Sequence, residues 1–412
     1  MRYFTITDGN VLCSYIPVKN ILSLLDNGSY IREVFVDDKR LGEKMELNKN
    51  TFLYLIQMGA DIHDGKDCFI KWAVRHNNIE IANLIFDLDT NVNLYHDIFL
   101  DICNKGNLEM VRLFLNRGID IKCDPRVLVE ATKSNNMDLV KLLVELGLDI
   151  HYNGNWAVQL AVQNINIPLV EYFLGRGADI TDDNNLAIIW ASKIHNVQLM
   201  KLLLEHGADP SARNSNPLFV ATNCNNYDVA ELLIINGSNI NSRSLNIASS
   251  NNSIKMVELL INYGADVSDS RAIGYAIKNN NLSMVRLLIM SGMKIMPNEK
   301  NIYKAVKNNN ELMIKLLIEN GANINDDQRT ISQAVINNDL SIIKLLLSEG
   351  AQIHKEVATV VNAVTVENES ILKLLIENGA NVNEFDNRAM KYAKAKGNTR
   401  MIQLLIELGS ED

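Results

Sequence analysis

The sequence predicts an all-α solenoid, a fold in which short helix pairs stack one on the next, and two observations predict it. The first is a glycine that recurs every 27 to 30 residues, at Gly118, Gly147, Gly177, Gly207, Gly237, Gly264, Gly292, Gly321, Gly350, Gly379 and Gly409. The second is an alanine sixteen residues before each glycine from Gly147 onward, at Ala131, Ala161, Ala191, Ala221, Ala248, Ala276, Ala305, Ala334, Ala363 and Ala393. A fixed period of this length is typical of repeat arrays, whose units contact only their neighbours.

Residues 1–50 do not fit the repeat and are expected to form a small N-terminal α+β cap. They read as a helix up to Asn27-Gly28, a turn signal, followed by an extended strand from Tyr30 to Val36. A cap is needed because the first repeat would otherwise leave apolar surface in water. The repeat array is expected to occupy residues 51–412.

Each recurring residue of the repeat has a physical reason, as residues 305–325 illustrate. A short first helix surrounds Ala305, three asparagines follow it, and a second helix ends at Gly321. The Leu316-Leu317 pair and the apolar pair four residues earlier have the spacing of a helix that buries a broad face. The alanine allows neighbouring first helices to approach closely, and the glycine and asparagines tolerate left-handed backbone at the helix ends.

These residues carry a resemblance to the ankyrin-repeat family. The family pattern TPLHxAAxxGHxxxVxxLLxxGAxxN is matched most fully by NPLFVATNCNNYDVAELLIINGSNIN, from Asn216 to Asn241. The resemblance covers Lys66 to the C-terminus, and more weakly from Thr51, and it implies twelve helix pairs preceded by an incomplete unit. Two departures follow: the histidine that ties neighbouring turns in the family is missing, and the short repeats imply blunt loops where the family has a β-hairpin finger.

The N-terminal piece resembles the amoebal giant-virus (Mimivirus-type) ankyrin proteins. Those proteins carry a YGxYLREV stretch before the array, and this chain has NGSYIREV from Asn27 to Val34. The resemblance implies a viral protein that acts on host proteins in the host-cell cytoplasm. No F-box-like helix follows the array, which departs from the poxviral ankyrin proteins that recruit ubiquitin ligases.

Composition narrows the class of partner. The formal net charge is −9, which argues against general phosphate binding, so no nucleic acid partner is expected. The five cysteines are far apart and odd in number, and no CxxC spacing exists, so we expect reduced thiols in the cytoplasm. Neither a signal peptide nor a membrane-spanning stretch is found, and we expect a monomer that does not bind membranes.

No residue pattern indicates catalysis, a cofactor or a metal. The seven histidines are scattered, with no pair at i, i+4, and no Gly-rich phosphate loop or nucleophile motif is present. The segment DIHDGKD, residues 61–67, lacks the closing glutamate of a calcium loop and is interpreted as an inter-repeat turn. Trp72 and Trp190 share the position before the alanine, where helix packing explains them.

One register of the repeat is the candidate partner-binding groove. The residues two and three positions after the alanine lie, in the family's geometry, at the end of the first helix that faces the concave groove. Basic residues recur there although the chain is acidic, which suits an acidic partner segment; a generic polar helix end is an equal alternative. The candidate residues are Arg75, His76, Lys105, Lys133, Lys193, Ile194, Asn223, Lys278, Lys307, Asn337 and Lys396.

The function that follows is a non-catalytic protein-binding scaffold. Two alternatives stay open: an adaptor that delivers a partner to an enzyme such as a ubiquitin ligase, for which only residues 1–50 lie outside the array, and a structural component of a virus particle. An enzyme is the least expected class, since repeat packing already explains the residues from which a catalytic site would be built.

Overall fold

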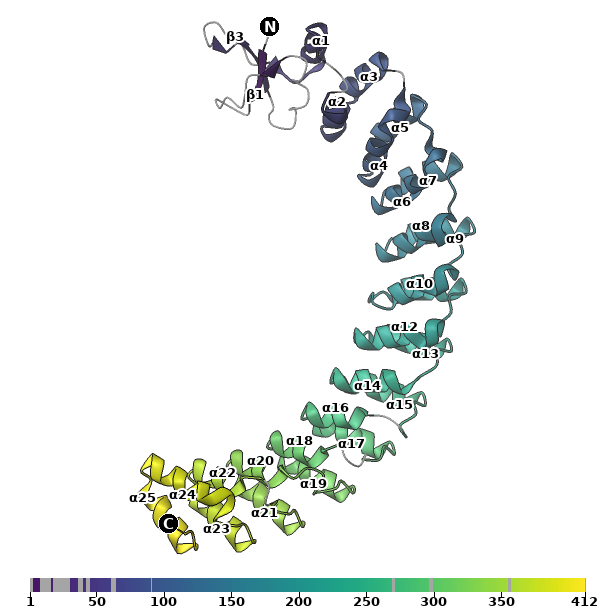
Figure 1. The fold of residues 1–412 in the computed structure, drawn as a ribbon. Coiled ribbons are helices and arrows are strands. Elements are labelled where there is room, and N and C mark those ends of the chain that lie inside the picture. Colours follow the sequence, from purple (N-terminus) through teal and green to yellow (C-terminus); the bar gives the residue numbers. More distant parts are fainter. Residues whose placement is uncertain are drawn as a thin grey trace. The chain divides into compact units, whose positions relative to one another are not determined.

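The computed structural model describes residues 3–7, 16–17, 30–35, 40–41, 45–60, 64–89, 91–268, 271–295, 299–354 and 357–411 (Figure 1). The chain divides into two compact units, each described by itself. Unit 1 comprises Met1–Ala187 with Glu205–Ala208, and unit 2 comprises Ile188–Leu204 with Asp209–Asp412. The predicted boundary at residue 50 stays a prediction.

Unit 1 begins with a small antiparallel sheet. Its strands are β1 (Tyr3–Thr7), β2 (Ile16–Pro17), β3 (Tyr30–Phe35), β4 (Arg40–Leu41) and β5 (Met45–Glu46). The sheet order is β2-β1-β3-β4, and β5 also pairs with β3. Strand β3 confirms the extended segment expected from Tyr30, whereas the helix expected before Asn27-Gly28 falls outside the described residues.

Twelve helix pairs follow in the described part of the chain, as the repeat predicted, after the single helix α1 (Lys49–Gln57). The first helices are α2 (Asp64–Arg75), α4 (His96–Asn104), α6 (Arg126–Lys133), α8 (Tyr152–Gln163), α10 (Asp182–Ala191), α12 (Ala212–Asn223), α14 (Ser242–Ser250), α16 (Ala272–Lys278), α18 (Asn301–Lys307), α20 (Thr330–Ile336), α22 (Thr359–Thr365) and α24 (Glu384–Lys396). The second helices are α3 (Ile79–Leu88), α5 (Leu108–Asn116), α7 (Met137–Glu145), α9 (Ile167–Gly175), α11 (Val197–Glu205), α13 (Tyr227–Ile235), α15 (Ile254–Asn262), α17 (Leu282–Met290), α19 (Glu311–Glu319), α21 (Leu340–Ser348), α23 (Glu369–Glu377) and α25 (Thr399–Glu407). Since α2 begins at Asp64, the interpretation of residues 61–67 as a turn was wrong for their second half.

The first helices form the tightly packed side of each unit. Successive first helices such as α16, α18 and α20 contact one another more extensively than the second helices α17, α19 and α21 do. The repeat alanines Ala276, Ala305 and Ala334 lie at these contacts and are fully buried. A larger side chain there would force the helices apart, because close-packed cores tolerate little added volume.

The helix ends use left-handed backbone where the sequence predicted it. Gly321 has a φ of +83°, its amide donates to the Ile318 carbonyl, and the next amide donates to the Leu317 carbonyl. A Cβ added to Gly321 would meet nothing within 4 Å, so glycine is required by the backbone conformation and not by space. Asn280 and Asn309 adopt φ values of +55° and +53° at the turn between the two helices.

Asparagine ladders tie neighbouring repeats together and replace the family's missing histidine. The Asn310 side chain caps α19 by accepting from the Met313 amide at 2.9 Å, and its Nδ2 donates to Oδ1 of Asn280 in the preceding repeat at 2.7 Å. The same pair of bonds recurs at the N-terminus of α17, from Asn281. Each ladder residue satisfies a helix terminus and joins two repeats at once.

The connections between repeats carry no strand in the described part of the array, which agrees with the blunt loops expected. Several first helices instead start with left-handed backbone that the sequence pattern did not predict. Residues 153–155, 213–215 and 385–387 all have positive φ, as do Asp183 and Asn185 at the start of α10. Arg213 and Phe385 are unusual there, because side chains with a Cβ rarely adopt this region.

Candidate functional site

The basic residues of the predicted register lie at the exposed ends of the first helices. Arg75, Lys105, Lys133, Lys193, Lys278, Lys307 and Lys396 are all solvent-exposed. For Arg75, Lys133, Lys193, Lys278 and Lys307, the repeat places the side chain there because the two residues before it, the alanine and its successor, are buried in the stack, as at Ala305 and Val306. Lys105 and Lys396 stand three positions after the repeat position, beyond the buried part of the helix. The structure therefore presents these seven side chains to solvent, and their use as a partner-binding surface stays a prediction.

Two of the lysines in unit 1 are already paired within their own helices. Lys105 Nζ lies 2.7 Å from Asp101 Oδ2, and Lys133 Nζ lies 2.6 Å from Glu130 Oε1. Their charges are locally compensated, which weakens their attraction for an external carboxylate. The sequence register alone did not distinguish them from the lysines of unit 2.

The four lysines of the register in unit 2 differ from those two. Across the described residues, no carboxylate forms an ion pair with Lys193, Lys278, Lys307 or Lys396. Two of them instead lie over aromatic rings: Lys193 Nζ is 4.8 Å from the centroid of Trp190, and Lys396 Nζ is 5.8 Å from that of Tyr392. A cation held over a ring loses less conformational freedom when it binds a carboxylate.

Two arginines extend this cation–aromatic arrangement between repeats. Arg329 lies with its guanidinium carbon 4.6 Å from the ring of Tyr303, and Arg243 lies 3.7 Å from that of Phe219. Both aromatic residues sit two positions before the repeat alanine, on the first helix. Arg329 also binds Asp327, so its charge is partly compensated.

The remaining candidates of the register serve the stack. Asn337 donates to the Val306 carbonyl of the preceding repeat at 2.6 Å, and the Ile194 carbonyl accepts from Asn226 at 2.9 Å. The Asn223 carbonyl likewise accepts from the next repeat, and the His76 ring stacks on Trp72 with centroids 4.2 Å apart. The side chains of Asn337 and His76 are thus engaged within the array, whereas Ile194 and Asn223 contribute only main-chain carbonyls. A partner-binding role for the four residues stays a prediction.

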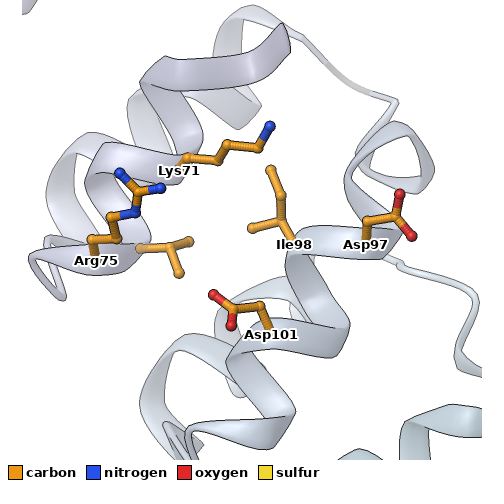
Figure 2. Close-up of a pocket in the computed structure, with 6 residues that line it drawn as sticks. Lys71, Arg75, Asp97, Ile98 and Asp101 are labelled. Carbon is orange, nitrogen blue, oxygen red and sulfur yellow. The ribbon is translucent and has the colours of Figure 1, made fainter. Parts of the chain in front are cut away.

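A pocket lies between α2 and α4 in unit 1 and brings together residues that the sequence pattern did not connect. It encloses about 220 Å³ and is lined by Lys71, Val74, Arg75, Asp97, Ile98 and Asp101. Figure 2 shows Lys71 and Arg75 on α2 opposite Asp97 and Asp101 on α4. Val74 and Ile98 are 6% and 7% exposed and form its apolar floor. The signal for this site was the four-residue spacing of like charges on each helix.

A thiol, an imidazole and a carboxylate meet at the N-terminus of α4. Cys123 Sγ lies 3.6 Å from His96 Nε2, and the same nitrogen lies 3.9 Å from Asp124 Oδ2. Burial, Asp120 and Asp124 raise the pKa of Cys123, so its thiol stays protonated and is a poor nucleophile. The hydrogen bond from Arg126 lowers the pKa of Asp124, which ties that carboxylate to a structural role.

The described residues contain no group of three histidine, cysteine, aspartate or glutamate side chains placed to hold a metal ion. Among the helices described, none is both long and apolar enough to cross a membrane.

The stacked helix pairs, the buried alanines and the left-handed helix ends define a helical-repeat protein. A sequence profile described as "Ankyrin repeats (3 copies)" matches residues 98–184, 158–244 and 331–412, which is more than half of the chain. The chain belongs to the ankyrin repeat family.

Among solved structures, the ankyrin repeat domain of Bcl-3, described as a unique member of the IkappaB protein family, is similar to this chain. The two share 27% sequence identity over 46% of this chain and 97% of that one, with a TM-score of 0.39. No curated protein matches this chain.

Proposed function

We propose that the chain is a non-catalytic scaffold that binds an acidic segment of a protein partner on the uncompensated lysines of unit 2. Ankyrin repeats are generally protein–protein interaction modules. The observation that carries the proposal is that Lys193, Lys278, Lys307 and Lys396 share one exposed register and have no carboxylate partner among the described residues.

The spacing of two of these lysines suits an extended acidic segment. Lys278 and Lys307 end the contacting helices α16 and α18, and packed helices lie about 8 to 10 Å apart. An extended chain advances about 3.3 Å per residue. Acidic residues three positions apart would therefore reach both lysines, and the exposed Tyr275 before Lys278 supplies apolar contact.

A triple charge reversal tests the proposal. Lys193→Glu, Lys278→Glu and Lys307→Glu together should lower partner recovery at least tenfold, because each exposed ion pair contributes about 0.2 to 1 kcal/mol and the reversal adds repulsion. Recovery is measured by affinity purification with quantitative mass spectrometry, at low and high salt, since screening should weaken the wild-type interaction.

A matched control separates a local effect from net charge. Lys201→Glu, Lys344→Glu and Lys373→Glu make the same change on exposed positions of the second helices α11, α21 and α23. This variant should retain wild-type recovery. Equal recovery for the two triple variants would remove the lysines of unit 2 from the proposal.

The cellular setting is proposed on the sequence resemblance alone. The NGSYIREV segment favours a giant-virus protein that acts as a monomer on host proteins in amoebal cytoplasm, so proximity labelling in infected amoebae is the first search for the partner. Recovery of ubiquitin-ligase subunits that depends on residues 1–50 would favour the adaptor alternative, and abundance in purified particles would favour the structural one.

A further inference from the structure

A small polar cavity lies in unit 2, where the loop after α21 meets the start of α24. It encloses about 170 Å³, and its lining includes His354 from that loop and Asn381, Asn383, Glu384 and Phe385 from the start of α24 and the residues before it. Sites for drug-sized ligands and cofactors enclose about 300 to 1,000 Å³. The volume of this cavity therefore suits a group of the size of one side chain, and the chemistry of its lining decides which one.

Glu384 brings a buried carboxylate to this cavity. The residue is 6% exposed, and its carboxylate accepts hydrogen bonds from the Val360 and Val361 amides at the start of α22. An ionised carboxylate offers about four acceptor positions, so capacity for further donors remains. Across the part of the chain that the structure describes, no basic side chain forms an ion pair with Glu384. Burial raises the pKa of this carboxylate, as expected for a charge without a counter-ion.

His354 brings a second polar group to the same cavity. Its Nε2 is buried and has no hydrogen-bond partner among the described residues. With the ring proton on Nδ1, this nitrogen accepts a hydrogen bond. A ligand group that lies between His354 Nε2 and the Glu384 carboxylate must therefore donate to both.

An alkylammonium group meets these requirements better than the other common polar groups. It donates three hydrogen bonds, and its charge compensates that of Glu384. A hydroxyl donates only one hydrogen bond, and a guanidinium carries five donors in a planar fork, which is more than these two acceptors satisfy. The exposed Phe385 also lines the cavity, and aromatic rings attract ammonium groups.

We infer that this cavity binds the ammonium group of a lysine side chain from a protein partner, between Glu384 and His354. The argument for this occupant is charge complementarity, since the carboxylate is buried and the described residues supply no cation for it. The inference rests on the proposed function, because it names a second contact for a protein partner of unit 2.

Histidine NMR on the full-length chain tests the inference without the partner. Nα-acetyl-lysine methylamide is titrated into protein with isotope-labelled histidine rings, and the signal of His354 is assigned from its loss in His354→Gln. This signal should shift saturably with the lysine derivative and with n-butylammonium, which carries the same group. It should not shift saturably with n-butanol, which has the same chain length and one donor. A response to n-butylammonium alone would indicate a site for free amines and overturn the assignment to a protein lysine.

Two variants separate the buried carboxylate from general changes in charge. Glu384→Gln keeps an oxygen for the Val361 amide and removes the charge, so it should weaken the affinity for the lysine derivative at least tenfold. Asp386→Asn removes the same charge from an exposed position two residues away and should leave the affinity unchanged.

The inference is overturned if no saturable shift occurs, if n-butanol gives an equal shift, or if Glu384→Gln binds as tightly as wild type. The comparison of ligands on the wild type decides the matter even where Glu384→Gln fails to fold. The triple charge reversal in unit 2 tests the proposed function by partner recovery and not by these small probes, so the two can fail separately.

Discussion

Replacing Asn310 by alanine should destabilise the boundary between two repeats by about 1.5 kcal/mol. The change removes the cap on the Met313 amide, which is worth about 1 kcal/mol at a helix N-terminus. It also removes the 2.7 Å bond to Asn280, which is exposed and is worth about 0.5 kcal/mol. The two losses act on α18 and α19 of one repeat and on its contact with the preceding one.

Asn310→Asp separates the two contributions. Aspartate keeps the oxygen that caps α19 and its charge favours a helix N-terminus, but it cannot donate to Asn280. We therefore expect a loss between zero and about 0.5 kcal/mol for this variant. Because a repeat array need not unfold in one step, native-state hydrogen exchange of the amides in residues 301–319 and in the preceding repeat, residues 272–290, is the appropriate measurement.

The comparison of the two variants can refute the reasoning. If alanine and aspartate destabilise residues 301–319 equally, the cap is not the main contribution. If the loss in the alanine variant is confined to α19 and leaves exchange in the preceding repeat unchanged, the asparagine ladder does not couple the repeats.

Two further predictions concern the same half of the chain. Gly321→Ala should destabilise the local repeat by about 1 to 2 kcal/mol, since alanine is strained at a φ of +83°. Urea titration followed by circular dichroism measures the loss of stability. A loss below about 0.3 kcal/mol would show that the turn relaxes without strain. Arg329 and Lys300 hold the pKa of Asp327 well below its usual range. The ionised carboxylate therefore stabilises the fold above about pH 4, which is the pKa of an aspartate in the unfolded chain. Its contribution to the free energy of unfolding is lost as the pH falls below that value. Asp327→Asn should consequently lower stability at pH 7, with the difference from wild type shrinking in urea titrations at pH 4 and pH 3; a constant difference would contradict the linkage.

The sequence predicted most of the fold because the signals of this fold are local. A helix end needs a left-handed residue and a capping oxygen, so Gly321 and Asn309 mark their positions wherever they stand. The alanine period then determined the number of repeats, since each buried alanine marks one first helix. The left-handed turn at residues 385–387 was missed because Phe385 carries no signal for that conformation.

The candidate site was predictable only as a register. Exposure of the lysines follows from the helical period, but ion pairing does not. Lys105 meets Asp101 one turn away, while Lys278 meets no carboxylate among the residues that the structure describes. The pocket could not be predicted from the sequence, because it forms only where α2 and α4 lie side by side and bring residues 71 and 101 to the same cavity.

By itself, then, the sequence determined the repeat, the helix ends marked by glycine and asparagine, and the register of exposed basic residues, because each depends on a few neighbouring positions. Only the tertiary structure decided which charges are compensated and which polar groups cross between repeats. Glu384 illustrates the second: it is 6% exposed and its Oε1 accepts the Val361 amide of the preceding repeat at 2.9 Å, and burial raises its pKa. The sequence alone does not distinguish a glutamate on the surface from one that is buried and caps a helix of the neighbouring repeat, because the difference arises only when the repeats pack together.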